Sequence, residues 1–162
     1  MTQRSLPLLA LLLITTPVLA DGKIATRIDS STEDGETFSN LGFADASCEE
    51  ECHTATFSCS STGAITIELA DIDAKHAAAA IQKENKQVLV SVGGKSFDYF
   101  IQEMQYQEMT GSWWLISHTL DENARELAPA IAKAKSIEAV VDKQKIVLPV
   151  DANVKKWAAA CK

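Results

Sequence analysis

The sequence has no run of basic residues and no segment in which basic and aromatic side chains alternate. Its 162 residues include 15 Lys and Arg against 22 Asp and Glu. Nucleic-acid binding depends on clustered positive charge that neutralises phosphates, and docking on anionic lipid needs the same charge. The composition therefore argues against both roles.

Familiar catalytic motifs are missing as well. The chain contains no G-x-S-x-G, no H-E-x-x-H and no phosphate-binding loop. Its three histidines, His53, His76 and His118, have no adjacent residues that would mark a catalytic triad. We interpret His76 and His118 as ordinary half-exposed side chains, and we expect neither an enzyme nor a cofactor.

Carboxylates occur together at three places: Asp71 and Asp73, Glu49–Glu51, and Asp121-Glu122. Glycoside hydrolysis needs two carboxyl groups across a cleft, with separated pKa values, and a sequence cannot show such a cleft. The first pair has the position of a helix cap, and the other two groups have the composition of solvated loops. We therefore assign them no chemistry.

The only long apolar run lies at the N-terminus. Arg4 precedes a leucine-rich stretch from Leu6 to Thr16, and Val18-Leu19-Ala20 suits a signal peptidase. This run is too short to cross a bilayer core of about 30 Å. We predict that Met1–Ala20 is a signal peptide, that residues 21–162 form one domain without internal repeats, and that the protein is periplasmic or secreted. No membrane insertion is expected after cleavage.

All four cysteines, Cys48, Cys52, Cys59 and Cys161, follow the predicted cleavage site. An even number in an exported chain predicts two disulfides, for which three connectivities exist. The segment Cys48–His53 (CEEECH) is one residue longer than the C-x-x-C-H haem signal, and its cysteine spacing also suits zinc. We interpret it as a disulfide loop, because no cytochrome-like helices or second cysteine pair accompany it. A haem or metal carrier remains the alternative.

The segment Gln87–Thr119 has the pattern of three β-strands joined by two tight turns. Gly93-Gly94 suits a two-residue hairpin turn because both central positions require positive φ. The alternation of apolar residues changes parity near Gln102-Glu103, which predicts a β-bulge or a break there. Trp113–His118 is the third strand.

Other strands are expected on either side of this meander, and a loop is expected at Ser30–Glu36 from its polar composition. The strands are Lys23–Asp29, Phe38–Phe43, a hairpin of Thr54–Cys59 with Ala64–Leu69, and a last hairpin of Ser136–Asp142 with Lys145–Val150.

Three helical segments complete the pattern. The first follows Asp73, and its apolar face consists of Ala74, Ala77, Ala78 and Ile81. The second spans Asp121–Lys135, and because of Pro129 we expect it to be regular only from Ala128. The third follows Asp151, and its apolar face consists of Val154, Trp157, Ala158 and Cys161. The last stripe places Cys161 over a strand, and we pair Cys59 with Cys161 and Cys48 with Cys52. The fold class is α+β: an antiparallel sheet or partly open barrel with two to three packed helices, stapled by disulfides.

The ending KIVLPVDANVKKWAAAC, together with the earlier TFSC strand, resembles the ending of several small exported proteobacterial proteins. In those proteins a short strand leads into a helix that stops at a cysteine, and some have been linked to type VI secretion or to host invasion. The resemblance extends from Cys59 to Cys161. It implies a periplasmic disulfide-bonded domain and transfers no functional residue.

We therefore expect a monomeric, non-enzymatic exported binding or envelope-associated protein; its partner is unknown, and another protein is one candidate. The expected binding patch is aromatic: Trp113 and Trp114 must face opposite sides of their strand, and the outer one would lie beside Tyr99 or Tyr106. In the alternative arrangement, the Lys23–Asp29 strand covers that tryptophan too. A small hydrolase is the second hypothesis. A cleft that holds His53 or His118 with a carboxylate of raised pKa would favour it.

Overall fold

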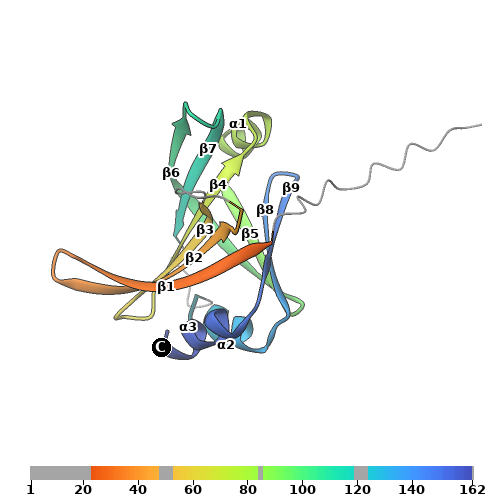
Figure 1. The fold of residues 1–162 in the computed structure, drawn as a ribbon. Coiled ribbons are helices and arrows are strands. Elements are labelled where there is room, and N and C mark those ends of the chain that lie inside the picture. The colour runs from red at the N-terminus through yellow and green to blue at the C-terminus, as the bar shows by residue number, and fades with distance from the viewer. Residues whose placement is uncertain (1–22, 48–52, 84–85, 119–123, 162) are drawn as a thin grey trace, which may run out of the picture.

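The computed structural model describes residues 23–47, 53–83, 86–118 and 124–161. Nine antiparallel strands form one sheet in the order β1-β2-β3-β4-β7-β6-β5-β8-β9, and the sheet curls into a half-barrel (Figure 1). The strands are β1 (Ile24–Glu33), β2 (Glu36–Asp45), β3 (His53–Ser60), β4 (Ile65–Ile72), β5 (Gln87–Val92), β6 (Lys95–Gln107), β7 (Ser112–His118), β8 (Ser136–Val141) and β9 (Gln144–Pro149); the helices are α1 (Ala74–Gln82), α2 (Ala124–Lys133) and α3 (Ala152–Ala160).

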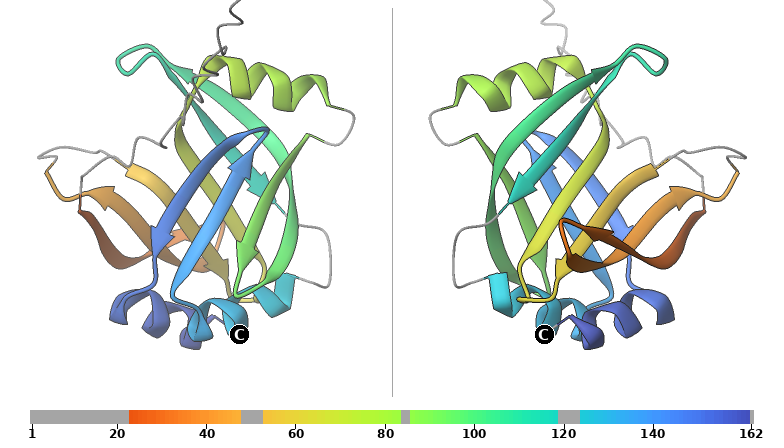
Figure 2. Two further views of the ribbon diagram at one scale, coloured as in Figure 1. Left: turned by 90° about the vertical axis from the view of Figure 1, so that its right-hand side faces the viewer. Right: turned by 90° about the vertical axis from the view of Figure 1, so that its left-hand side faces the viewer.

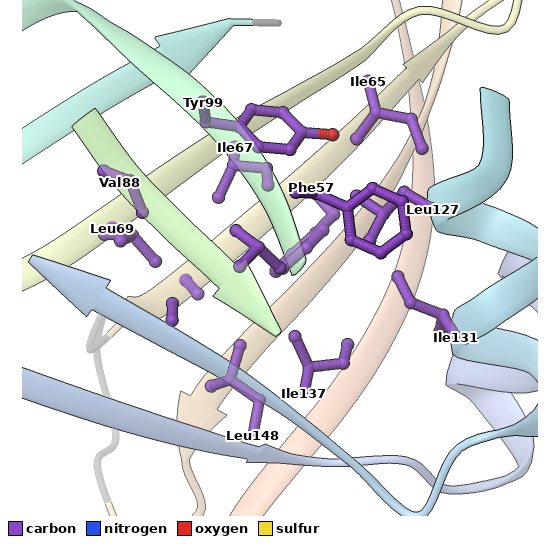
Figure 3. Packing of buried hydrophobic residues seen from close by; sticks show 14 of the residues in the cluster. Phe57, Ile65, Ile67, Leu69, Val88, Tyr99, Leu127, Ile131, Ile137 and Leu148 are labelled. Atoms are coloured by element: carbon purple, nitrogen blue, oxygen red, sulfur yellow. The ribbon is translucent and has the colours of Figure 1, made fainter. Parts of the chain in front are cut away.

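The helices lie at the two ends of the half-barrel (Figure 2). α2 and α3 pack on each other at one end, where α3 contacts β1 and β2 and α2 contacts β5 and β6. α1 crosses the other end, where it contacts β7 and β8. Alternate side chains of the strands fill the interior, and Leu127 and Ile131 of α2 reach into it (Figure 3). The predicted α+β class and the partly open barrel agree with this architecture, in which the sheet dominates.

The central meander has the predicted form. Gly93 and Gly94 both have positive φ, at 57° and 84°, as the two-residue turn requires. The register between β6 and β7 shifts between Ile101 and Glu103, where the bulge was predicted. β6 continues to Gln107, so β6 and β7 form a long hairpin. The bulge keeps apolar side chains inward on both halves of β6.

The predicted loop at Ser30–Glu36 is wrong, because β1 runs on to Glu33 and pairs with β2 across a tight turn at Asp34-Gly35. The outer part of this hairpin projects away from the helix-covered body of the half-barrel (Figure 1). Solvent therefore reaches most of its side chains, which explains a loop-like composition on a regular strand pair. We call residues 30–39 the arm.

The C-terminal helix α3 matches its prediction. The Asp151 side chain accepts a hydrogen bond from the Val154 backbone N–H at 3.0 Å, which caps the helix. The predicted stripe of Val154, Trp157, Ala158 and Cys161 is buried. Cys161 is bonded to Cys59 of β3, with the two Cα atoms 5.8 Å apart. This bridge confirms one of the two predicted pairings; the other cysteine pair lies outside the described residues, as does the predicted signal peptide.

The other two helices differ from their predictions in detail. α1 buries Ala77 and Ala80, whereas Ile81, expected on its apolar face, is 42% exposed. The burial stripe is rotated because α1 covers the barrel end and does not lie along a sheet face. α2 begins at Ala124 and runs unbroken through Pro129, although a regular helix was expected only from Ala128. Pro129 is exposed, so its ring faces solvent and the packing of Leu127 holds the helix together.

Neither β1 nor β9 pairs with a further strand in the described part of the chain, so the half-barrel has two free edges. Edge strand β1 is bound to the start of α3, where Asn153 Nδ2 donates to the backbone oxygen of Thr26 at 3.1 Å. No described helix is long and apolar enough to cross a membrane.

Candidate functional site

A hollow of about 330 Å³ lies on the outer face of the sheet, between the arm and strands β4, β7 and β6. We call it the outer groove. Six strands contribute to it, and most of its side chains are polar. Its lining comprises Ser31, Glu33, Phe38, Asn40, Ser58, Thr66, Glu68, Gln102, Glu103, Ile116 and His118.

The register of the sheet explains why these residues meet. Asn40 of β2 is opposite Ser58 of β3, Ser58 is opposite Thr66 of β4, and Thr66 is opposite His118 of β7. Directly opposed residues of neighbouring strands point to the same face of a sheet. These four residues therefore form one polar row across the outer face, which is the floor of the outer groove.

A second row lies one pleat further along the strands. Glu68 of β4 and Glu103 of β6 are both opposite Ile116 of β7, one on each side of it. Neighbouring strands are about 4.8 Å apart, so these two glutamates are rooted about 10 Å from each other. Ile116 lies between them as an apolar floor.

The arm supplies the remaining wall with Ser31, Glu33 and Phe38. Asn40 Nδ2 donates to Ser31 Oγ at 3.0 Å, which joins β1 to β2 and orients the amide inside the groove. Phe38 is the only aromatic side chain in the lining that carries no polar group. The wall therefore offers both an apolar ring and hydrogen-bonding groups to whatever enters.

Glu68 is a half-buried carboxyl group of the outer groove. Burial raises the pKa of Glu68, the neighbouring carboxylate of Glu33 raises it further, and His53 lowers it to a lesser extent than burial raises it. The ring of His118 is held by Thr66, whose Oγ1 lies 3.0 Å from His118 Nδ1. A half-buried carboxyl group and a positioned imidazole thus share one cleft.

The predicted aromatic patch is divided by the sheet. Tyr106 and Trp113 are opposite each other and pack as a tilted pair with ring centroids 5.5 Å apart, and Tyr106 is 51% exposed. Trp114 faces the outer side, opposite Gln105, and is half-buried. Tyr99 is fully buried in the core (Figure 3) and cannot belong to a surface patch. Tyr106 was expected beside the tryptophan of the outer face, which is Trp114, but it lies beside Trp113 on the other face.

The Tyr99 hydroxyl group is buried without a hydrogen-bond partner in the described residues. Burial raises the pKa of Tyr99, because the phenolate would lose its hydration there. The side chain packs among apolar residues of β3, β4 and α2 (Figure 3). Its role in this structure is to fill the core.

Another polar cluster joins α1 to the β8–β9 turn. His76 Nδ1 lies 3.0 Å from Asp142 Oδ2, and Lys83 Nζ donates to Asp142 Oδ1 at 2.6 Å. The hydrogen bond from Lys83, followed by that from His76, lowers the pKa of Asp142 to about 2. This cluster is a structural clamp for the helix that closes one end of the half-barrel.

Glu49–Glu51 and Asp121-Glu122 lie outside the described residues, and the remaining described candidates do not assemble into a site. Asp73 is the N-cap residue of α1, although its side chain makes no capping hydrogen bond, and Asp71 accepts a hydrogen bond from Ser112. Within the described ranges, no group of three or more His, Cys, Asp or Glu side chains is arranged to hold a metal ion. His53 begins β3, and the rest of the CEEECH segment lies outside the described residues.

Comparison with known proteins gives no relative: no family model, no curated protein and no solved structure matches this chain.

Sequence reasoning found one residue of the outer groove, His118, and missed the carboxylates. Glu33, Glu68 and Glu103 are 35 residues apart in sequence at each step and come from three different strands. No local motif can mark such a set. The available signal was the strand alternation itself, which places Glu68 and Glu103 on outward faces, but only the strand order β4-β7-β6 makes them neighbours of one residue.

Proposed function

We propose that this chain is an exported binding protein that receives its ligand in the outer groove. The hollow between the arm and the sheet supports this proposal. Its volume falls within the usual range for small-molecule sites, about 300–1,000 Å³. Its lining combines a few apolar side chains with amide, hydroxyl and carboxyl groups, which are the groups that fix a ligand's orientation.

The proposal is tested by filling the groove. Ser58 lies in the polar row of the floor, so Ser58→Trp would occupy the space that a ligand needs. Val147→Trp is the matched control, because it places the same side chain on an exposed position of β9 away from the groove. A thermal-shift screen against small molecules should give hits with the wild type and with Val147→Trp that are lost with Ser58→Trp. Hits that bind all three proteins equally would contradict the proposed site.

Export is a separate part of the proposal. The Cys59–Cys161 disulfide supports it, because structural disulfides persist in oxidising compartments. Mass spectrometry of the protein from its native host should find Asp21 as the N-terminal residue. A mature chain that begins at Met1 would contradict the predicted compartment.

A second candidate function is hydrolysis in the same groove. The observation in its favour is the cleft that holds His118 together with Glu68, a carboxyl group whose pKa is raised by burial. Perturbed carboxyl groups in clefts are common in active sites. If the protein is a hydrolase, Glu68→Gln should abolish turnover in a substrate screen, whereas Glu138→Gln, on β8, should retain it.

A further inference from the structure

We propose that the outer groove binds a saccharide chain and hydrolyses a glycosidic bond held between Glu68 and Glu103. This inference rests on the outer groove as the ligand site and gives the second candidate function a substrate class and a reaction. It requires three features of the groove. The lining must suit sugars, one carboxyl group must lie on each side of the bond, and the two carboxyl groups must have different surroundings so that one acts as acid and the other as base.

The lining suits a neutral, polyhydroxylated ligand. Sugar hydroxyl groups are both donors and acceptors, and the amides of Asn40 and Gln102 can serve both. The C–H groups on one face of a pyranose ring carry small positive partial charges, so they pack on the negative face of an aromatic ring such as Phe38. An acidic peptide would be repelled by the carboxylates of Glu33 and Glu103, whereas a neutral sugar is not.

The two glutamates stand on opposite sides of one strand, as glycoside hydrolysis requires of a pair of carboxyl groups across a cleft. Glu68 and Glu103 flank Ile116 in one row of the outer face and both line the hollow. Their backbones are about 10 Å apart, by two inter-strand spacings. Inverting enzymes place their carboxyl groups about 6.5–9.5 Å apart, and retaining enzymes about 5–5.5 Å apart. Glutamate side chains that rise side by side from backbones about 10 Å apart fit the inverting range, whereas the retaining range would require both side chains to lean towards each other over Ile116.

The surroundings of the two glutamates assign their roles. Glu68 is half-buried, and this burial favours its protonated form, as a general acid requires. Glu103 is exposed to solvent, and Gln105 Nε2 donates to its Oε1 at 2.6 Å. That hydrogen bond holds one carboxylate oxygen in place and leaves the other to accept a proton from water. Glu68 is therefore the acid, and Glu103 is the base.

The reaction then balances with water as the only co-reactant. The Glu68 carboxyl group gives its proton to the glycosidic oxygen while the bond from that oxygen to the anomeric carbon breaks. A water molecule attacks the anomeric carbon from the opposite side and loses a proton to the Glu103 carboxylate. The products are two shorter saccharides, one with inverted anomeric configuration. Exchange with solvent returns the proton from Glu103 to Glu68.

The test uses α- and β-linked tetrasaccharides of glucose and of N-acetylglucosamine, with the full secreted chain. NMR of the fresh product should show inversion at the anomeric carbon. Because general acid–base catalysis contributes about 10²- to 10⁴-fold, Glu68→Gln and Glu103→Gln should each lower kcat by about that factor. Glu138→Gln, a surface glutamate of β8, should keep the wild-type rate. Near-UV circular dichroism of each variant confirms that it is folded.

Three results would overturn the inference. Tetrasaccharides that bind without being cleaved would leave a binding protein and remove the reaction. Cleavage with retention of configuration, or cleavage that persists in folded Glu68→Gln, would refute the assigned roles. If no tetrasaccharide binds, while other ligands still bind in a manner blocked by Ser58→Trp, the substrate class is wrong and the proposed binding site stands.

Discussion

The disulfide between Cys59 and Cys161 should contribute a large part of the stability of this fold. It closes a loop with a sequence separation of 102 residues, which includes most of the sheet. In the chain-entropy model a loop of about 100 residues is worth about 4.7 kcal/mol, because the bridge restricts the unfolded chain. The double variant Cys59→Ala/Cys161→Ala should therefore unfold about 4–5 kcal/mol more easily than the oxidised wild type.

Urea denaturation monitored by tryptophan fluorescence measures this difference. The slope of the transition should also rise, because an unbridged denatured chain exposes more surface. The variant Cys48→Ser/Cys52→Ser is the matched control; if those cysteines form the predicted short loop, its loss should cost far less in the same model. A double alanine variant within about 1 kcal/mol of the wild type would refute the loop-entropy argument, since typical native bridges contribute about 2–5 kcal/mol.

Three further predictions follow from the described contacts. Trp157→Phe should cost about 1–3 kcal/mol in urea denaturation, because the fully buried indole N–H donates to the Ser39 backbone oxygen, which would lose its partner. Asp142→Asn should destabilise the fold at neutral pH. The folded-state pKa of Asp142 is lowered to about 2, so the carboxylate contributes fully to the free energy of unfolding above the unfolded-state pKa of 3.8. The difference in unfolding free energy between variant and wild type should therefore shrink as the pH falls from 3.8 towards 2. In single-tryptophan variants, a groove ligand should reduce acrylamide quenching of Trp114, which lies on the outer face, and leave that of Trp113 unchanged.

Local patterns predicted the elements whose sequence carries their own geometry. Gly93-Gly94 requires positive φ, the parity change near Gln102 requires a bulge, and the stripe that ends at Cys161 requires a buried helix face. Each of these depends only on residues close in sequence. The Cys59–Cys161 pairing was predictable because a helix must cover the strand beneath it.

The features that failed depend on contacts far along the chain. The arm is polar because it leaves the body of the half-barrel, so its composition indicated a loop although its backbone is paired. Ile81 is exposed because α1 covers a barrel end. The outer groove depends on strand order: β7 returns between β4 and β6, and only then do Glu68 and Glu103 share Ile116 as neighbour. The spacing of residues along the sequence does not predict that strand order.

The location of the ligand is the central claim, and backbone NMR of the labelled protein tests it most directly. The tetrasaccharide that binds best, titrated into the protein, should shift the amide signals of Glu68, Gln102 and Ile116 and those of the arm, with little change at the far end of the β6–β7 hairpin. Met109, which is fully exposed in the turn between β6 and β7, is the internal reference. Shifts concentrated around Met109 and Tyr106, with the arm and Ile116 unchanged, would place binding on the aromatic pair and contradict the outer groove.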